Sequence, residues 1–260
     1  MSDLKVGVLP WAIVLSALAL YAIRVVMTGR ARTARADRDG GSVLLSMHFV
    51  EFGGWFLAPV GRFVVRIGGT PDGVTWFSLM SAVGAGVALA FGRFGLATLL
   101  GTIAAFCDSL DGIVARLTGL SSEAGETLDA MVDRYAESAF FVGLLVHYRS
   151  SSVVTAFVAL AMVGAFMVSY TSAKAEAQGV EPPRGLMRRS ERATYLLVGA
   201  GLTPFANALV PASASLIVRD APMLLAILLI AIIANVSTFR RVSLIRQALQ
   251  NNELRNTDAP

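Results

Sequence analysis

Four aspartates are spaced so that two pairs of carboxylates could hold a metal ion. Asp108 and Asp111 lie three positions apart, and Asp129 and Asp133 lie four apart. On a helix, either spacing places both side chains on one face. The short polar link Thr118–Glu126 predicts antiparallel neighbouring helices whose Asp faces converge. Because Mg2+ and Mn2+ prefer carboxylate oxygens, the pattern predicts a divalent-cation site.

The sequence around these aspartates is apolar, which makes their charge costly. A charged side chain at the centre of a bilayer costs about 2.5–3.5 kcal/mol on insertion scales. The alternative to a bound cation is a structural ion-pair network, but few basic residues lie inside the apolar segments. The chain has only two histidines, His48 and His147, so a carboxylate is the expected general base. The single cysteine, Cys107, excludes an internal disulfide and is expected to be a small buried residue.

Composition indicates an integral membrane protein. Hydrophobic residues make up 55% of the 260 positions, and charged residues make up 15%. Soluble domains carry about 25% charged residues. The net charge is +4, but the basic residues are clustered along the chain. A lipid bilayer is therefore the expected partner, and no nucleic acid is expected.

The predicted fold class is an all-α polytopic membrane protein in four parts. Residues 1–41 hold an N-terminal transmembrane helix, with a removed signal peptide as the alternative, and a basic loop that favours retention. Residues 42–69 are expected to form an amphipathic helix at the cytoplasmic side, with a further buried span as the alternative. Residues 70–239 form a six-helix membrane domain. Residues 240–260 form a cytoplasmic tail with a short interfacial helix at its start.

Six long apolar segments define the predicted membrane domain. They are Gly73–Gly92, Phe94–Leu117, Gly125–Tyr148, Ser150–Ala173, Ala193–Val218 and Ala221–Phe239. The segment Lys174–Arg192 is expected to be a charged loop, and Pro204 and Pro211 are expected to kink or end the fifth span. Lysine and arginine are concentrated on the connections of one side. The positive-inside rule places this side, and with it the Asp cluster, at the cytoplasm.

The Asp pattern is similar to the signature of a known family. The order Asp108-x2-Asp111-Gly112-x2-Ala115-Arg116-x8-Gly125-x3-Asp129-x3-Asp133 resembles that of the CDP-alcohol phosphotransferases, and every fixed position is filled. The resemblance implies that a CDP-linked lipid, usually CDP-diacylglycerol, donates its phosphatidyl group to a small polar alcohol while CMP leaves. It also implies a homodimer, and a bacterial inner membrane is the expected location.

By the same resemblance, the site holds two divalent ions, Mg2+ or Mn2+. Asp108, Asp111 and Asp129 would hold one ion, and Asp108, Asp129 and Asp133 the other. Asp133 would be the general base for the acceptor hydroxyl. The positions expected to contact the CDP-lipid are Gly112, Ala115, Arg116, Gly125, Thr70 and Thr75.

Simple physical roles fit several of these positions. Gly112 and Gly125 let a nucleotide approach the backbone, although close helix packing is the alternative. Arg116 can bind phosphate oxygens through two parallel hydrogen bonds, with snorkelling to the interface as the alternative. Thr70 begins a Thr-Pro-Asp stretch that resembles the family's Thr-Pro-Asn corner, but it could also simply start a helix.

The identity of the acceptor is left open by the sequence. Ser169–Ala177 and Arg189–Arg192 resemble segments of the bacterial phosphatidylinositol-phosphate synthases, in which a Lys and an Arg two residues apart bind the acceptor's phosphate. Here Ser172 stands at the Lys position and Lys174 at the Arg position. Lys174, Arg189 and Arg192 are the candidate acceptor contacts, with attraction to anionic lipids as the alternative role. Inositol phosphate, inositol, glycerol 3-phosphate and serine remain candidates.

Two other classes of protein compete with an enzyme. Carboxylates inside a membrane are also found in divalent-cation transporters. A transporter would not require Arg116 and two glycines at fixed distances from the aspartates. A non-catalytic membrane scaffold of the same fold would be expected to have lost one or more aspartates, yet all four are present. The pattern therefore favours a phospholipid-synthesis enzyme.

Overall fold

The computed structural model describes residues 3–28, 47–181, 185–211 and 213–257. These residues are helical wherever they are regular, and no strand occurs among them. The predicted basic loop between residues 30 and 41 lies outside the described residues. The helices are α1 (Asp3–Thr28), α3 (Met47–Arg66), α4 (Pro71–Ala90), α5 (Phe94–Thr118), α6 (Glu123–His147), α7 (Ser152–Ala177), α8 (Arg189–Leu209), α9 (Leu216–Arg219) and α10 (Ala221–Thr257).

The outer surface of the bundle is that of an integral membrane protein. Within the described chain, five helices are long and apolar enough to cross a bilayer: α1, α4, α5, α7 and the Ala221–Asn252 part of α10. Large apolar side chains face outward on them, such as Val26, Met80 and Phe239. The sequence predicted seven spans. Helices α6 and α8 are present at the expected places but fall outside these five, so the predicted count of six plus one is not confirmed.

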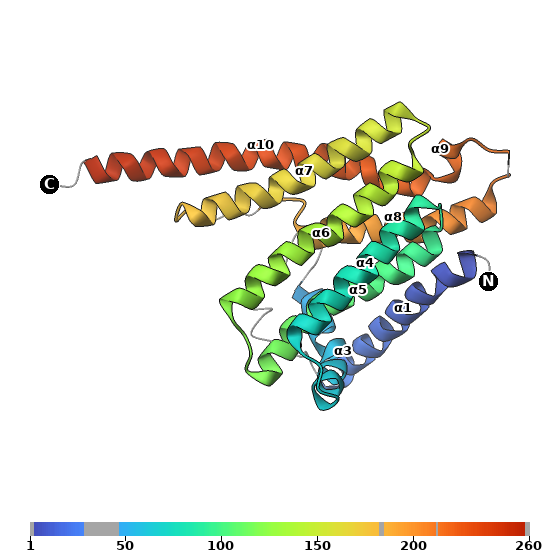
Figure 1. The fold of residues 1–260 in the computed structure, drawn as a ribbon, viewed down its shortest axis with the longest axis horizontal. Coiled ribbons are helices and arrows are strands. Elements are labelled where there is room, and N and C mark those ends of the chain that lie inside the picture. The colour runs from blue at the N-terminus through green and yellow to red at the C-terminus, as the bar shows by residue number, and fades with distance from the viewer. Residues whose placement is uncertain (1–2, 29–46, 182–184, 212, 258–260) are drawn as a thin grey trace.

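Helix α4 packs along both α5 and α6, and the three helices lie side by side in Figure 1. We expected α5 and α6 to be direct neighbours, but α4 lies against both of them over most of their length. The contact between α4 and α6 is close because Gly86 faces Gly143. A Cβ atom on Gly143 would lie 2.1 Å from the Gly86 carbonyl oxygen, so a side chain there would push the helices apart.

Polar caps begin the helices that carry the site. The Thr70 hydroxyl accepts a hydrogen bond from the Gly73 amide at 3.1 Å and starts α4, with Pro71 in the first turn. The Ser122 hydroxyl accepts one from the Gly125 amide at 3.1 Å and starts α6. Asp129 and Asp133 therefore lie in the second and third turns of a helix whose beginning is set by its cap.

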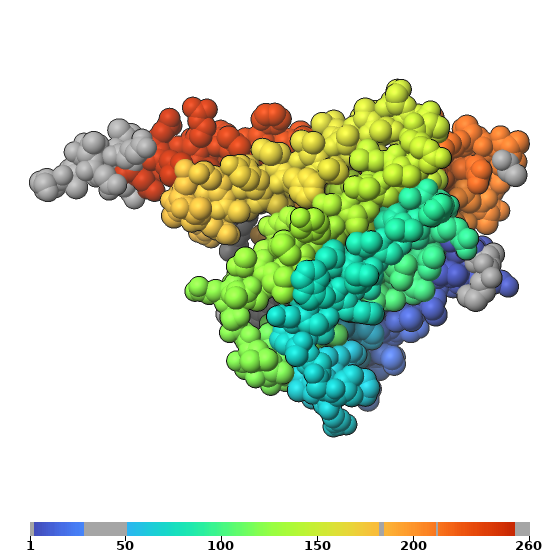
Figure 2. Space-filling view, in the orientation of Figure 1, coloured from blue at the N-terminus to red at the C-terminus, as the bar shows by residue number. Residues whose placement is uncertain are grey.

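Four boundaries differ from the sequence prediction. Helix α7 continues to Ala177, so Lys174 lies in its last turn and not in the charged loop. Helix α8 begins at Arg189, so Arg189 and Arg192 lie in its first turn and not in a loop. The fifth predicted span ends at Leu209 and is followed by the short α9. Helix α10 continues without a break to Thr257, so most of the predicted tail extends the last span and projects beyond the bundle (Figures 1 and 2).

Helices α1 and α3 pack against α5, the helix that carries Asp108 and Asp111. Helix α1 packs against α5 and α8, and α3 packs mainly against α5. The predicted amphipathic helix is thus confirmed as a helix, while its place in the headgroup layer stays a prediction. Leu57 of α3 and Leu110 and Val114 of α5 are buried together, next to the turn of α5 that carries Asp108 and Asp111.

Candidate active site

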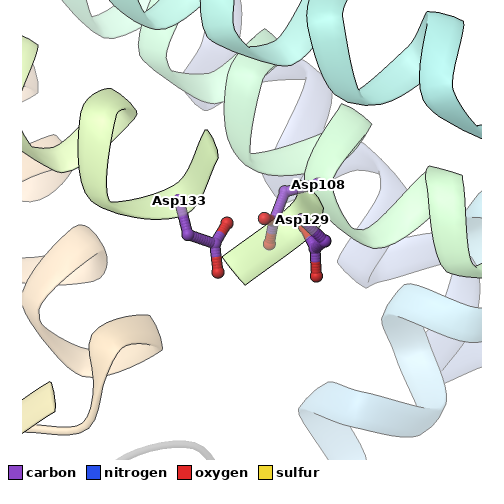
Figure 3. Close-up of side chains that lie close together, drawn as sticks. All are labelled: Asp108, Asp129 and Asp133. Carbon is purple, nitrogen blue, oxygen red and sulfur yellow. The ribbon is translucent and has the colours of Figure 1, made fainter. Parts of the chain in front are cut away.

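Three of the four aspartates meet between α5 and α6. Carboxylate oxygens of Asp108, Asp129 and Asp133 lie within 4.8 Å of one another (Figure 3). Asp133 is buried, and the other two are half-buried. Negative charges this close repel one another unless a cation lies among them. An all-oxygen donor set of this kind fits Mg2+ or Mn2+, and these three residues are one of the two ligand sets expected from the family resemblance.

The fourth aspartate points to a different partner. Asp111 is buried, and one of its carboxylate oxygens accepts a hydrogen bond from the Thr75 hydroxyl of α4 at 2.8 Å. The other oxygen accepts one from the Gly112 amide at 2.6 Å. Thr75, expected at the CDP-lipid, thus orients a signature carboxylate in this structure. Such outer partners commonly fix the direction of a metal ligand.

Arg189 reaches this carboxylate group from α8. One Nη donates to Asp108 Oδ1 at 2.9 Å, and the other pairs with Asp133 Oδ1. One guanidinium therefore bridges carboxylates from two helices. Its side chain is 34% exposed, against 11% for Asp133. The sequence predicted Arg189 as an acceptor contact; the structure places it at the aspartates.

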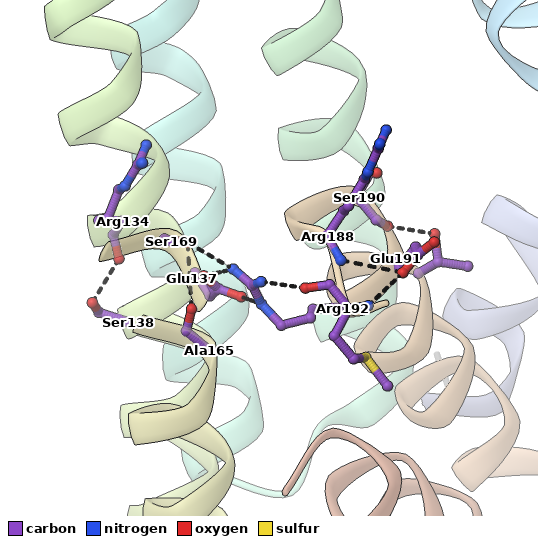
Figure 4. A network of polar contacts seen from close by, with 11 residues as sticks. Arg134, Glu137, Ser138, Ala165, Ser169, Arg188, Ser190, Glu191 and Arg192 are labelled. Carbon is purple, nitrogen blue, oxygen red and sulfur yellow. Dashed lines mark hydrogen bonds and ion pairs between the residues drawn. The ribbon is translucent and has the colours of Figure 1, made fainter. Parts of the chain in front are cut away.

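Arg192, three residues further along α8, contacts protein groups through its guanidinium (Figure 4). Its Nε and Nη2 donate to the two carboxylate oxygens of Glu137 at 2.6 and 2.8 Å. The same guanidinium donates to the Met187 carbonyl at 2.7 Å and to the Ser169 hydroxyl at 3.2 Å. The Arg192 side chain is fully buried. This predicted acceptor contact is therefore engaged with protein groups on all sides.

The turn before α8 is held by several side chains. Met187 has a φ of 63°, which is uncommon for a residue with a side chain. Glu191 accepts hydrogen bonds from the amides of Met187 and Arg188 at 2.7 and 3.1 Å. Ser237 of α10 donates to the Leu186 carbonyl at 2.9 Å. These bonds fix the start of α8 and hence the position from which Arg189 extends.

Two residues that the sequence pattern did not single out lie beside the site. Glu137 follows Asp133 by one helical turn, and this spacing could have indicated that Glu137 lies on the same face of α6. Arg241 of α10 is buried and donates to the Ser172 hydroxyl at 2.6 Å. Arg241 therefore brings a positive charge to the position where the family resemblance expected a lysine. Lys174 lies on the exposed side of α7.

The other signature residues line the same end of α5 and α6. Arg116 is exposed, and a Cβ atom placed on Gly112 would have the Arg116 Nη1 as its nearest neighbour, at 3.4 Å. Ala115 and Gly125 are partly exposed. No neighbouring helix among the described residues would block a side chain at Gly112 or Gly125, so helix packing does not explain these two glycines. Their backbone remains open to a ligand.

Comparison with known proteins agrees with this geometry. The family model for CDP-alcohol phosphatidyltransferase matches residues 69–231. The chain belongs to this family. The family's region covers α4 to α8 and the start of α10, and it leaves α1 and α3 outside. The predicted membership of this family is thus confirmed.

Similar members of the CDP-alcohol phosphatidyltransferase family are named phosphatidylinositol phosphate synthase. The one from Mycobacterium tuberculosis is 34% identical over 152 residues, which are 56% of this chain and 70% of the relative. The one from Streptomyces avermitilis is 33% identical over 182 residues, which are 68% of this chain and 73% of the relative.

Solved structures of the same family share the fold. The crystal structure of the M. tuberculosis phosphatidylinositol phosphate synthase with manganese and citrate matches with a TM-score of 0.63 and 26% identity, over 73% of this chain and 88% of that one. A structure of that enzyme with CDP-diacylglycerol bound matches equally well, over 92% of its own chain. The predicted all-helical family fold is thereby confirmed.

Proposed function

We propose that the chain transfers the phosphatidyl group of CDP-diacylglycerol to the hydroxyl of a small polar alcohol and releases CMP. One observation carries this proposal: three carboxylates from two helices converge within 4.8 Å in a member of this family. A solved relative binds CDP-diacylglycerol, and another of its structures contains manganese. Both findings support a metal-dependent reaction on this lipid.

Asp108, Asp129 and Asp133 would hold one divalent ion, and Asp108, Asp129 and Asp111 a second. Bound divalent ions supply positive charge that stabilises negative charge as it develops on a pyrophosphate. The convergence of three carboxylates supports the fit of these residues to such an ion. Thr75 would keep Asp111 turned toward its position through the 2.8 Å hydrogen bond.

Asp133 is the proposed general base. The acceptor oxygen attacks the phosphorus that carries diacylglycerol, the bond from that phosphorus to the CMP oxygen breaks, and the hydroxyl proton passes to Asp133. Among the described residues the site offers no cysteine or histidine nucleophile, because Cys107 is buried and His147 lies near the other end of α6. A single displacement is therefore the simplest mechanism.

The CDP-lipid is proposed to lie over the exposed end of α5 and α6. Arg116 would bind its phosphates with two parallel hydrogen bonds. Gly112 and Gly125, with Ala115 between them in sequence, would let the nucleotide approach the backbone. Thr70 and Thr75, at the start of α4, would also contribute to binding of the CDP-lipid. Positive-inside logic places this end at the cytoplasm, and a homodimer stays a prediction.

A phosphorylated alcohol is the proposed acceptor, with inositol phosphate first. Arg189 reaches Asp108, Arg241 donates to the Ser172 hydroxyl of α7, and Lys174 is exposed on that same helix. A phosphate group would match these charges, whereas free inositol and serine would not. The relatives named phosphatidylinositol phosphate synthase support the same choice. Arg192 is proposed to position α8, because its guanidinium is enclosed.

An acceptor screen with the purified full-length chain tests this function. Labelled CDP-diacylglycerol and Mn2+ are supplied with inositol phosphate, glycerol 3-phosphate, inositol or serine, and the CMP and lipid products are measured. We expect CMP release and a new phospholipid with inositol phosphate, and neither product after chelation of the metal. Absence of CMP release with every acceptor would overturn the enzymatic function and favour a transporter or a scaffold.

A further inference from the structure

Two ion pairs lie one helical turn apart between α6 and α8. Asp133 of α6 pairs with Arg189 of α8, and Glu137 pairs with Arg192. We call these the outer pair and the inner pair. In the inner pair the side chains are 0% and 8% exposed, whereas Arg189 in the outer pair is 34% exposed. The two pairs join the same two helices but differ in access to solvent.

The inner pair fixes the backbone from which Arg189 extends. Arg192 makes hydrogen bonds to Glu137, Met187 and Ser169, so the first turn of α8 cannot shift without breaking them. Arg189 lies in that same turn. Its long side chain can therefore change the place of its guanidinium while its backbone stays where it is.

The outer pair involves two carboxylates of the proposed metal site. Arg189 contacts Asp108 and Asp133, and these two carboxylates belong to the three-carboxylate group. A guanidinium bridging them and a divalent ion held by them compete for the same space and charge. At equal distance a doubly charged ion is attracted about twice as strongly as a guanidinium, so the ion displaces it.

We propose that Arg189 is a built-in counter-cation of the Asp108–Asp133 pair. It bridges the two carboxylates and gives them up to a divalent ion. Once displaced, its guanidinium turns to a phosphate of the bound substrate. The turn of the guanidinium to a substrate phosphate deepens the proposed function and rests on it. The competition between Arg189 and a divalent ion does not.

Arginine is suited to this task. Its planar fork presents donors to two carboxylates at once, as it does here to oxygens from α5 and α6. The bridge keeps two like charges at the spacing that an incoming ion needs. A lysine ammonium is a single point of charge and would bridge the two carboxylates less well.

Mn2+ titration of the purified full-length protein, without lipid substrate, tests the proposal. We expect Arg189→Ala to bind Mn2+ about tenfold more tightly, because a competing positive charge is removed. The matched control is Arg188→Ala. This variant removes one positive charge from the residue next to Arg189. The hydrogen bond from the Arg188 backbone amide to Glu191 does not depend on the side chain and would be unaffected. That control should bind Mn2+ within about twofold of the unaltered protein.

Arg189→Lys provides a second variant if Arg189→Ala does not fold. Lysine keeps the positive charge but lacks the planar guanidinium that bridges the two carboxylates. We therefore expect the variant to bind Mn2+ about threefold more tightly than the unaltered protein. Mn2+ affinity that is unchanged or weaker in the folded Arg189 variants would overturn the counter-cation role alone. Failure of every protein to bind Mn2+ would overturn the metal site of the proposed function as well.

The acceptor kinetics separate this role from simple damage to the site. If Arg189 turns to a substrate phosphate, Arg189→Ala should raise the KM for the phosphorylated acceptor several-fold while Mn2+ binding tightens. A structural defect would weaken both. Opposite changes support the proposal, and parallel losses contradict it.

Discussion

Carboxylates at the two ends of the bundle have different surroundings. At the end where α5 begins, Asp3 accepts hydrogen bonds from the Gly95 and Leu96 amides at 2.8 and 3.2 Å. Near the end of α6, Asp220 lies 3.0 Å from the His147 Nε2. Each of these acids meets donors that belong to the protein. At the other end, Asp108, Asp129 and Asp133 lie against one another, and one guanidinium, that of Arg189, bridges Asp108 and Asp133.

This difference separates acids that stabilise the fold from acids that are kept for a ligand. A carboxylate with its own donor lowers the free energy of the folded state. Three carboxylates held together raise it, and the positive charge of Arg189, or of a divalent ion in its place, offsets that cost. Substitutions at the two ends should therefore act on different properties, which the following variants test.

The largest effect is expected for Asp133→Asn. Loss of the base should reduce turnover about a thousandfold while CDP-lipid binding changes little. The measurement is CMP release alongside nucleotide binding. Asp220→Asn at the other end is the control and should keep turnover within about threefold, since it lies far from the reacting groups. Normal turnover in Asp133→Asn would remove Asp133 as the base.

The next effect is expected for Glu137→Gln. This change leaves the buried Arg192 guanidinium without a carboxylate, which typically costs about 3–5 kcal/mol. Chemical denaturation in detergent should show a lower free energy of unfolding. Because the inner pair sets the start of α8, turnover should fall as well. Full stability in this variant would show that Arg192 does not depend on Glu137 for its charge balance.

The four aspartates illustrate what the sequence can predict about the site. Their spacing on two helices predicted that their faces converge, and three of them do. The spacing did not predict that Asp111 turns to Thr75, because its partner lies 36 residues away on α4. Nor did it predict the packing of α4 along both helices. That arrangement depends on the close contact of Gly86 with Gly143, which no local pattern reveals.

The arginines illustrate the limit more sharply. Arg189 and Arg192 were both predicted to contact the acceptor, because their segment resembles one in the phosphatidylinositol-phosphate synthases. Helix α8 starts earlier than its apolar sequence suggests. Arg189 and Arg192 are only three residues apart, yet the guanidinium of Arg192 is enclosed and that of Arg189 is accessible. Their partners lie 81 and 55 residues away, so their different roles follow from tertiary packing.

A smaller effect is expected for Arg116→Ala. Arg116 is exposed near Gly112, where a phosphate of the CDP-lipid is proposed to lie. Loss of one charge-assisted contact should raise the KM for CDP-diacylglycerol about tenfold and leave the KM for the acceptor nearly unchanged. Steady-state kinetics with each substrate varied in turn measures both. An unchanged KM for CDP-diacylglycerol would contradict the phosphate contact.

The smallest effect is expected for Asp3→Ala at the opposite end. Asp3 of α1 caps the first turn of α5, and loss of such a cap costs about 1 kcal/mol. Turnover should stay unchanged, because the turn of α5 that carries Asp108 and Asp111 lies toward the other end of that helix. Asp3→Asn keeps one side-chain oxygen, which can accept from one of the two amides, and should lose less stability. If Asp3→Ala instead weakened Mn2+ binding, then α1 would act on the aspartates along α5, and the two ends could no longer be treated as independent.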